Sequence, residues 1–266
     1  MNYTSRFGLE FNPFIKLSRD ILIETANYDE VKARLDYLTV TKGMGLITGD
    51  PGCGKTTIIR NWVKSLNQSA YKIIYLPLST LTVMESYRQL AQSFNLEPRY
   101  KKYENFNMIQ EAIRRLSIEK KITPVIIFDE ANYISNAFLN DLKILFNFDM
   151  DSKDLTVVLL VGQPTIINTL KLKANDAVRQ RIITSYNVET MSMEESSKYI
   201  IGKLKAAGSS QEVFTPGAIK AISSYANGNP RIISRTCDLA LMVADKLGKN
   251  FIDEDMAMMA INEREI

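Results

Sequence analysis

The chain has 266 residues and a formal net charge of +3, and 45% of its residues are hydrophobic and 24% charged, which is typical of a globular protein with one large domain or two small ones. It contains no histidine, and its two cysteines lie far apart in the sequence, which excludes histidine-based triads and histidine-ligated metals and favours a reduced, cytoplasmic protein. No apolar run has the length of a membrane span, and the amino terminus lacks the apolar core of a signal peptide, so we expect no membrane partner.

Strands and helices alternate over roughly the first 190 residues. Residues 7–14, which include two aromatics around Pro13, predict a segment that docks on the folded domain. Short apolar runs predict buried strands at residues 44–48, 73–76, 124–128 and 155–161. Apolar residues at helical spacing predict helices at residues 28–38, 57–63, 84–94, 107–116 and 137–146. Strands buried on both faces and alternating with helices predict an α/β fold with a parallel sheet between layers of helices.

The pattern changes near residue 190, after which no convincing strand follows. Four helices are expected at residues 193–207, 216–226, 230–247 and 253–262. Glycines stand near the helix ends, and Asp253 is a candidate N-cap for the last helix. We therefore expect an α/β domain over residues 1–190, including the docking segment, and a small all-helical domain over residues 191–266.

A glycine-rich run between the first expected strand and its helix fits the pattern of phosphate-binding loops. The run consists of Gly49, Asp50, Pro51, Gly52, Cys53, Gly54, Lys55, Thr56 and Thr57. In such loops backbone N–H groups surround the phosphates at the N-terminus of a helix, which favours negative charge. Lys55 is expected to reach the β- and γ-phosphates, and the Thr56 hydroxyl to hold Mg²⁺. The alternative, a chance glycine turn, does not explain the flanking strand and helix.

Two carboxylates follow the strand expected at residues 124–128. The carboxyl ends of parallel strands meet at the ligand edge of a sheet, which places Asp129 and Glu130 beside the glycine loop. Asp129 is expected to act on Mg²⁺, and Glu130 to orient and deprotonate an attacking water. The alternative is a strand end that carries two solvated acids.

Later polar residues extend the candidate site. Gln163, after the fourth expected strand, is placed to hydrogen-bond the γ-phosphate or the attacking water, unless it only begins a turn. Arg179 and Arg181 are candidates for an arginine that a neighbouring subunit supplies to the nucleotide, and the sequence does not choose between them. Arg231 follows Pro230 at a helix start and is placed to reach the phosphate of its own subunit.

In this order the motifs resemble those of AAA+ ATPases, and the resemblance covers nearly the whole chain. Within that class, residues 11–14, 129–132, 160–164 and 179–182 are similar to segments of ExeA-like ATPases and of transposition ATPases of the MuB and TnsC types. The resemblance implies a P-loop NTPase core with a helical lid, ATP and Mg²⁺ as cofactors, and homo-oligomers that form rings or filaments around double-stranded DNA. It also implies target selection and recruitment of a transposase. Asn132 stands where relatives often carry Gln or His.

A basic and aromatic segment at residues 99–103 is the first candidate for DNA contacts, and the resemblance to TnsC-type ATPases points to the same region. Lysine and arginine there would neutralise phosphates in a salt-sensitive way, whereas the alternative is a solvated loop. The candidate DNA contacts are Arg99, Lys101 and Lys102, with the hydroxyls of Ser79, Thr80 and Thr82, and with Lys171 and Lys173 as a second patch.

Three rival functions remain open. An ExeA-like secretion ATPase would carry a membrane helix and a peptidoglycan-binding region beyond its ATPase half, and the chain is expected to lack both. A non-catalytic ATP switch is disfavoured by the presence of Glu130. A replication-initiator loader would be expected to carry an appended DNA-reading domain.

Overall fold

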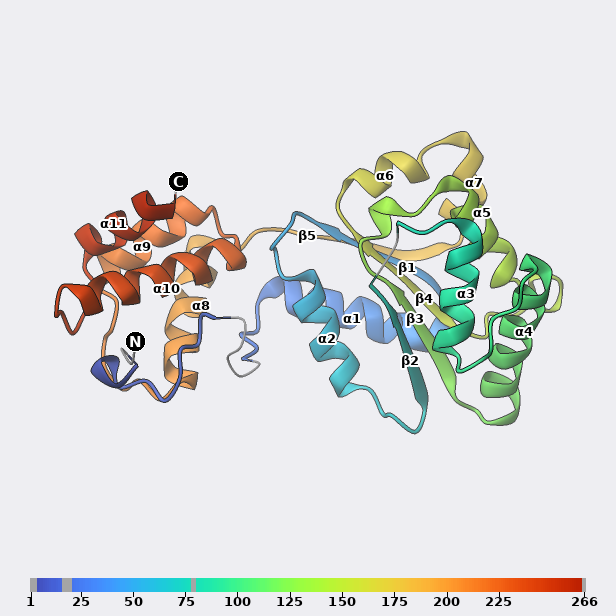
Figure 1. Ribbon diagram of the computed structural model, residues 1–266, viewed down its shortest axis with the longest axis horizontal. Helices are drawn as coiled ribbons and strands as arrows, with labels where there is room; N and C mark the ends of the chain where they lie inside the picture. Colours follow the sequence, from blue (N-terminus) through green and yellow to red (C-terminus); the bar gives the residue numbers. More distant parts are fainter. Residues whose placement is uncertain (1–3, 16–20, 78–79, 265–266) are drawn as a thin grey trace. The chain divides into compact units, whose positions relative to one another are not determined.

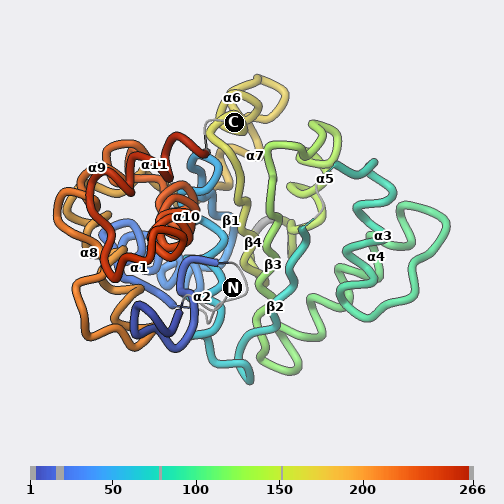
Figure 2. Tube along the Cα trace, turned by 60° about the vertical axis from the view of Figure 1, so that its left-hand side comes forward, coloured from blue at the N-terminus to red at the C-terminus, as the bar shows by residue number. Residues whose placement is uncertain are grey.

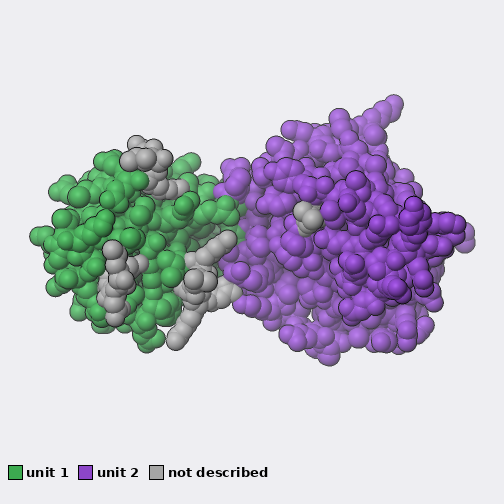
Figure 3. Space-filling view, viewed as in Figure 1, with its two compact units in different colours: residues 1–26, 52–54, 189–266 green, residues 27–51, 55–188 purple. Residues whose placement is uncertain are grey.

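A computed structural model describes residues 4–15, 21–77 and 80–264, so the candidate Ser79 lies outside the described residues. Contacts divide the chain into two compact units, shown in purple and green in Figure 3. Residues 27–51 and 55–188 form the first, here called the α/β unit. Residues 189–266 form the second, here called the helical unit, together with the described residues among 1–26 and residues 52–54.

The α/β unit contains a five-stranded sheet in which all paired strands are parallel, as the sequence predicts. The strand order is β2-β3-β4-β1-β5. The strands are β1 (Gly43–Gly49), β2 (Tyr71–Leu76), β3 (Thr123–Phe128), β4 (Val157–Gly162) and β5 (Ile182–Val188). The first four match the expected strands, whereas β5 was not expected and extends the sheet beside β1.

Helices cover both faces of this sheet (Figure 1). The described helices of the unit are α1 (Ala26–Thr41), α2 (Lys55–Ser65), α3 (Val83–Ser93), α4 (Lys102–Arg114), α5 (Asn136–Leu145), α6 (Thr165–Leu170) and α7 (Asp176–Arg179). Side chains alternate along each strand, so Leu46, Ile126 and Leu160 point into one core with α3, α4 and α5. On the opposite face α1 packs so closely that a Cβ added to Gly45 would lie 2.6 Å from Leu38.

The helical unit consists of α8 (Met193–Ala206), α9 (Pro216–Ala226), α10 (Pro230–Lys246) and α11 (Glu254–Arg264), close to the four expected helices. Asp253 caps α11 as predicted, because its carboxylate accepts a hydrogen bond from Met256 N at 3.0 Å. Gly228, just before α10, has φ +70, and a Cβ there would lie 1.9 Å from Met191 O. Only glycine therefore fits at this position.

The amino-terminal segment differs from the expectation, because it belongs to the core of the helical unit and not to the α/β unit. Figure 2 shows this segment in dark blue against the helices of that unit. The buried Phe14 ring meets Phe214 edge-on at 6.2 Å, and Asn12 donates a hydrogen bond to Asp238 at 2.6 Å. Lys203 of α8 donates to Pro13 O at 2.9 Å. Hydrophobic burial therefore joins this segment to helices that lie about 200 residues later.

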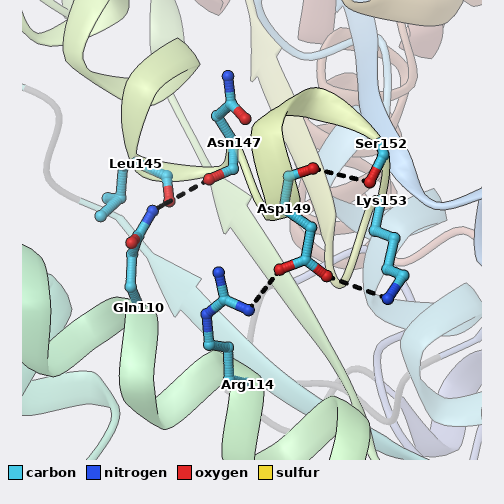
Figure 4. A network of polar contacts seen from close by, with 7 residues as sticks. All are labelled: Gln110, Arg114, Leu145, Asn147, Asp149, Ser152 and Lys153. Atoms are coloured by element: carbon cyan, nitrogen blue, oxygen red, sulfur yellow. Dashed lines mark hydrogen bonds and ion pairs between the residues drawn. The ribbon is translucent and has the colours of Figure 1, made fainter.

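A polar network fixes the loop that precedes β4 (Figure 4). Gln110 of α4 donates hydrogen bonds to the backbone oxygens of Leu145 and Asn147 at 3.1 and 3.2 Å. Arg114, one turn later on α4, is paired with Asp149 at 2.7 Å, and Lys153 lies 3.1 Å from the other carboxylate oxygen. These bonds hold Asp149 at φ +50, a left-handed conformation that side-chain-bearing residues seldom adopt.

Candidate functional site

The glycine-rich run forms the connection between β1 and α2, as expected. β1 ends at Gly49 and α2 begins at Lys55. Gly52 and Gly54 have φ values of +86 and +101, which side-chain-bearing residues rarely adopt. The glycines therefore permit the tight turn that brings backbone N–H groups toward a ligand at the start of an 11-residue helix.

The Lys55 side chain curls back over the loop that precedes it. Its Nζ donates hydrogen bonds to the backbone oxygens of Gly49 at 2.6 Å and Asp50 at 3.0 Å. These bonds place one positive charge beside the loop, at the carboxyl edge of β1. A group of phosphate oxygens bound in the loop would have a cation and a helix N-terminus next to it.

The carboxylate of Asp129 accepts hydrogen bonds on both oxygens. Oδ2 accepts from the Thr56 hydroxyl at 3.3 Å and from the Tyr75 hydroxyl at 2.6 Å, and Oδ1 accepts from Glu130 N at 2.9 Å. Asp129 is 8% exposed. Burial, and then the hydrogen bond to Asp129, raise the pKa of Tyr75 above its ordinary value, so this hydroxyl is a donor at neutral pH.

The oxygens of Thr56 and Asp129 suit Mg²⁺. Mg²⁺ prefers hard oxygen ligands and is usually held by one or two carboxylates together with water and substrate phosphates. Among the described residues there is no group of three or more histidine, cysteine, aspartate or glutamate side chains that could enclose a metal on its own. A site built from one hydroxyl, one carboxylate and the oxygens of a bound triphosphate needs no such group.

Glu130 lies at a sharp backbone turn directly after β3. Its φ and ψ are +50 and +39, in the left-handed region, and the turn leads into a short 3₁₀ helix over Ala131–Tyr133. The hydrogen bond from its N–H to the Asp129 carboxylate holds this turn. The Glu130 side chain is exposed at the carboxyl edge of the sheet, where it can meet water. Unfavourable backbone conformations of this kind cluster at functional sites.

Gln163 is tied to the Asp129 strand through Asn132, a residue to which the sequence assigned no role. The Asn132 side-chain oxygen accepts a hydrogen bond from Gln163 N at 2.9 Å. A Cβ on Gly162 would lie 2.7 Å from that same oxygen, so glycine is required where β4 ends. The signal in the sequence was the glycine before Gln163, because a glycine within a strand often marks a close approach of another backbone.

Arg179 is the last residue of α7, and Arg181 lies just before the start of β5. β5 runs parallel to β1, and Met44 near the start of β1 pairs with Ile182. The arginines therefore lie at the amino edge of the sheet, about 16–20 Å along the strands from the glycine loop. Arg179 is also paired with Asp176 at 2.8 Å. The separation of about 16–20 Å between the two sheet edges prevents either arginine from reaching the glycine loop of its own chain.

Arg231 is the second residue of α10 in the helical unit. Pro230 begins the helix, as the sequence predicts, and the Asn229 side chain caps it by accepting from Arg231 N at 3.0 Å and Ile232 N at 3.3 Å. Proline and the cap together fix where the helix starts, and so fix the backbone of Arg231.

The basic segment at residues 99–103 is held by Asn105, which is fully buried. The Asn105 amide accepts from Arg99 N at 2.8 Å and donates to Arg99 O at 2.8 Å and Lys101 O at 3.0 Å. Three such bonds give the segment one defined shape. Tyr100, within this segment, is 87% exposed.

The lysines and threonines proposed for DNA have different surroundings. Lys101 is exposed beside the ring of Tyr103, whereas Lys102 is paired with Asp141. Thr82 is the N-cap of α3 and forms a capping box with Glu85, so its hydroxyl already has a structural partner. Thr80, Lys171 and Lys173 are exposed.

Among the described residues, no helix is long and apolar enough to cross a membrane.

Comparison with known proteins places this geometry in a wider context. A protein-family model of the AAA domain matches residues 38–170. The chain is 31% identical, over 94% of its length, to the General secretion pathway protein A of Aeromonas hydrophila, of which it covers 46%. It is 21% identical, over 92% of its length, to the ATP-dependent target DNA activator B of Escherichia phage D108, of which it covers 73%. It therefore spans about half the length of the first relative and most of the second.

A solved structure of the Aeropyrum pernix ORC1 protein in complex with DNA matches with a TM-score of 0.70 at 14% identity. The match covers 96% of this chain and 69% of the ORC1 chain. At this level of identity the likeness concerns the fold.

Proposed function

Because the chain belongs to the AAA domain family, we propose that it binds ATP with Mg²⁺ and hydrolyses it. One observation carries this proposal. Lys55, Thr56, Asp129 and Glu130 come from two separate parts of the sequence, and they gather at the carboxyl edge of the parallel sheet. That edge is where open α/β sheets bind ligands.

Each of these residues has a defined task in the reaction. Lys55 neutralises the β- and γ-phosphates, and Thr56 with Asp129 holds Mg²⁺, which supplies charge neutralisation for the phosphate oxygens. Glu130 accepts a proton from water as the water oxygen attacks the γ-phosphorus. The bond from the γ-phosphorus to the bridging oxygen breaks, and ADP and phosphate leave. Gln163 hydrogen-bonds the γ-phosphate or the attacking water.

Assembly of several chains completes the site in this proposal. Neither Arg179 nor Arg181 can reach the loop of its own chain, because they lie at the opposite edge of the sheet. An arginine from a neighbouring chain stabilises charge on the transferred phosphoryl group in many such enzymes. ATP therefore links chains into a ring or filament. The ion pair between Arg179 and Asp176 does not decide which of the two arginines acts on the neighbouring nucleotide.

Double-stranded DNA is the surface on which we propose that the chains assemble, in order to select a target site and recruit a transposase. Similarity to the phage target DNA activator supports this role, and so does the rigid basic segment around exposed Tyr100. Contacts to phosphate from Arg99 and Lys101, repeated in each chain, would add up along the duplex.

A secretion-associated ATPase is the second candidate. It is favoured by the 31% identity to the General secretion pathway protein A over nearly the whole chain. In this case the oligomer would pass the energy of ATP hydrolysis to a protein partner, and DNA would have no effect on it.

One experiment separates the two candidates. The purified chain is sedimented with ATP or ADP, with and without a duplex DNA of random sequence, and phosphate release is measured in parallel. The first proposal requires ATP-dependent sedimentation with DNA and a faster release of phosphate. ATPase activity and oligomers that are indifferent to DNA would favour the secretion role. An absence of ATP hydrolysis in every condition would overturn both.

A further inference from the structure

Tyr75 lies outside every motif of the sequence, yet its hydroxyl makes the shorter of the two hydrogen bonds to Oδ2 of Asp129. The distances are 2.6 Å from Tyr75 and 3.3 Å from Thr56. Both donors meet the same oxygen, and the other oxygen is bound by Glu130 N at 2.9 Å. Three donors therefore fix the plane and direction of this carboxylate.

The fold explains why Tyr75 reaches the site. β2 pairs with β3 in parallel, with Tyr75 opposite Ile127. Side chains two residues apart in a strand share a face, so Asp129 and Tyr75 are diagonal neighbours on one face of the sheet, a spacing that a long aromatic side chain spans. The ladder continues past the strand ends, because Asp129 N donates to Leu76 O at 3.0 Å. β2 therefore holds both the backbone and the carboxylate of Asp129.

The Tyr75 side chain is only partly buried, so its position at the sheet edge, more than packing in the core, holds it there. Ile74 and Leu76 point into the core, whereas Tyr75 is 47% exposed. A phenylalanine would keep the β-strand preference and most of the packing at this position, so the hydroxyl is what the site gains from tyrosine.

We propose that Tyr75 is a positioning residue that orients the Asp129 carboxylate for Mg²⁺ bound with ATP. Partners that hydrogen-bond to metal-binding groups set the orientation of those groups, and their loss commonly weakens metal affinity 10- to 100-fold. This inference rests on the proposed function, since it assigns Tyr75 to the same nucleotide site.

The test compares Tyr75→Phe with wild type by calorimetric titration of ATP, first with EDTA and then over a series of Mg²⁺ concentrations. In EDTA we expect the variant to bind ATP with unchanged affinity. We define the Mg²⁺ midpoint as the Mg²⁺ concentration that gives half of the Mg²⁺-dependent gain in ATP affinity. This midpoint should be about tenfold higher in the variant. At saturating Mg²⁺, kcat should return to within about twofold of wild type. An unchanged Mg²⁺ midpoint would overturn the proposal.

Two further variants separate positioning from a general structural effect. Tyr71→Phe removes a hydroxyl from the opposite end of the same strand, and it should leave the Mg²⁺ midpoint unchanged. In an Asp129→Asn background, Tyr75→Phe should cause no additional loss, because the hydroxyl acts through that carboxylate. A full additional loss would show that Tyr75 acts elsewhere. If wild type shows no Mg²⁺-dependent ATP binding at all, the proposed function fails and not this assignment alone.

Discussion

The ammonium group of Lys102 is ion-paired with the carboxylate of Asp141 at 2.5 Å. Asp141 lies on α5 and its side chain is only 14% exposed. The same ammonium lies 5.5 Å from the centre of the Tyr87 ring, which is buried. Lys102 therefore joins the start of α4 to α3 and α5. Lys101, the preceding residue, instead lies 5.7 Å from the exposed Tyr103 ring.

This difference predicts that substitutions of the two adjacent lysines affect different properties, DNA binding in one case and stability in the other. Lys101→Ala should weaken binding to duplex DNA and lower the slope of log affinity against log salt by about 1, because one phosphate contact is lost per chain. Lys102→Ala should lower the free energy of unfolding by about 1–2 kcal/mol, because the Asp141 carboxylate loses its partner. Fluorescence anisotropy of labelled DNA and urea titration measure the two quantities.

Each lysine variant serves as the control for the other. A Lys101→Ala protein with the salt slope of wild type would remove this residue from the proposed DNA surface. Equal loss of stability in both variants would show that the ion pair with Asp141 contributes nothing specific.

Removal of the Lys55 ammonium tests the phosphate site. Lys55→Ala should abolish measurable ATP binding and lower hydrolysis on the order of 10²–10³-fold, since the charge beside the loop is lost. The fold should survive, because the Lys55 side chain hydrogen-bonds only to backbone oxygens of the loop in the contacts given above. Lys205→Ala, at an exposed position late in α8, is a matched loss of one positive charge. If the two variants hydrolyse ATP equally well, Lys55 is not at the nucleotide.

Glu130→Gln separates binding from chemistry. The amide cannot accept the proton of water, so hydrolysis should fall about 10²–10⁴-fold while ATP affinity is retained. ATP then stays bound, and the proposed assembly on DNA should persist instead of dispersing. Negative-stain microscopy and sedimentation with ATP and duplex DNA provide the measurement. A variant that stays monomeric under these conditions would contradict the proposed filament or ring.

The sequence predicts β1, β3 and β4 because they are buried on both faces and therefore form nearly continuous apolar runs. β2 is only partly buried, but Ile73, Ile74 and Leu76 still give it a short apolar run. β5 lacks that signal. It lies at the sheet edge, its residues alternate between buried and exposed, and it contains Thr184, Ser185 and Asn187. Such a strand is specified by its pairing with β1, which only the folded chain provides. Tertiary contacts also determine the position of the amino-terminal segment, because its aromatic residues do not indicate which of the two cores buries them.

Short sequence motifs identify the residues that carry the chemistry of the site. They do not identify the residues that support these side chains. The glycine loop, Asp129 and Glu130 are recognisable because each lies at a strand end. Tyr75 and Asn132 reach the site through tertiary contacts, and as single residues they look like an ordinary strand aromatic and a turn amide. Hydrogen-bond partners across strands are visible only when register is known.

The amino-terminal segment should contribute strongly to the stability of the helical unit. Phe14→Ala removes a buried ring that contacts Phe214, and it should lower the free energy of unfolding by about 3–5 kcal/mol. Ile15→Ala, at the next position, changes a side chain that is 40% exposed, so its effect should stay within about 0.5 kcal/mol. Urea unfolding followed by circular dichroism gives both values. Equal effects would show that the segment does not belong to this core.

The loop before β4 should lose stability as pH falls. The hydrogen bond from Arg114, and then that from Lys153, hold the pKa of Asp149 below its ordinary value of 3.8. The folded state therefore binds this proton less readily than the unfolded state. The stabilisation is fully present above pH 3.8 and disappears as the pH falls through the lower pKa of the folded protein.

Asp149→Asn tests this charge while keeping a residue that tolerates the left-handed backbone at φ +50. The variant should unfold at a lower urea concentration than wild type at pH 7, because the pairs with Arg114 and Lys153 are lost. The difference should shrink below pH 3.8, where protonation removes the charge from wild type as well. It should also shrink in high salt, which screens exposed pairs. A difference that is constant from pH 7 to pH 3 would show that shape, and not charge, accounts for Asp149 at this turn.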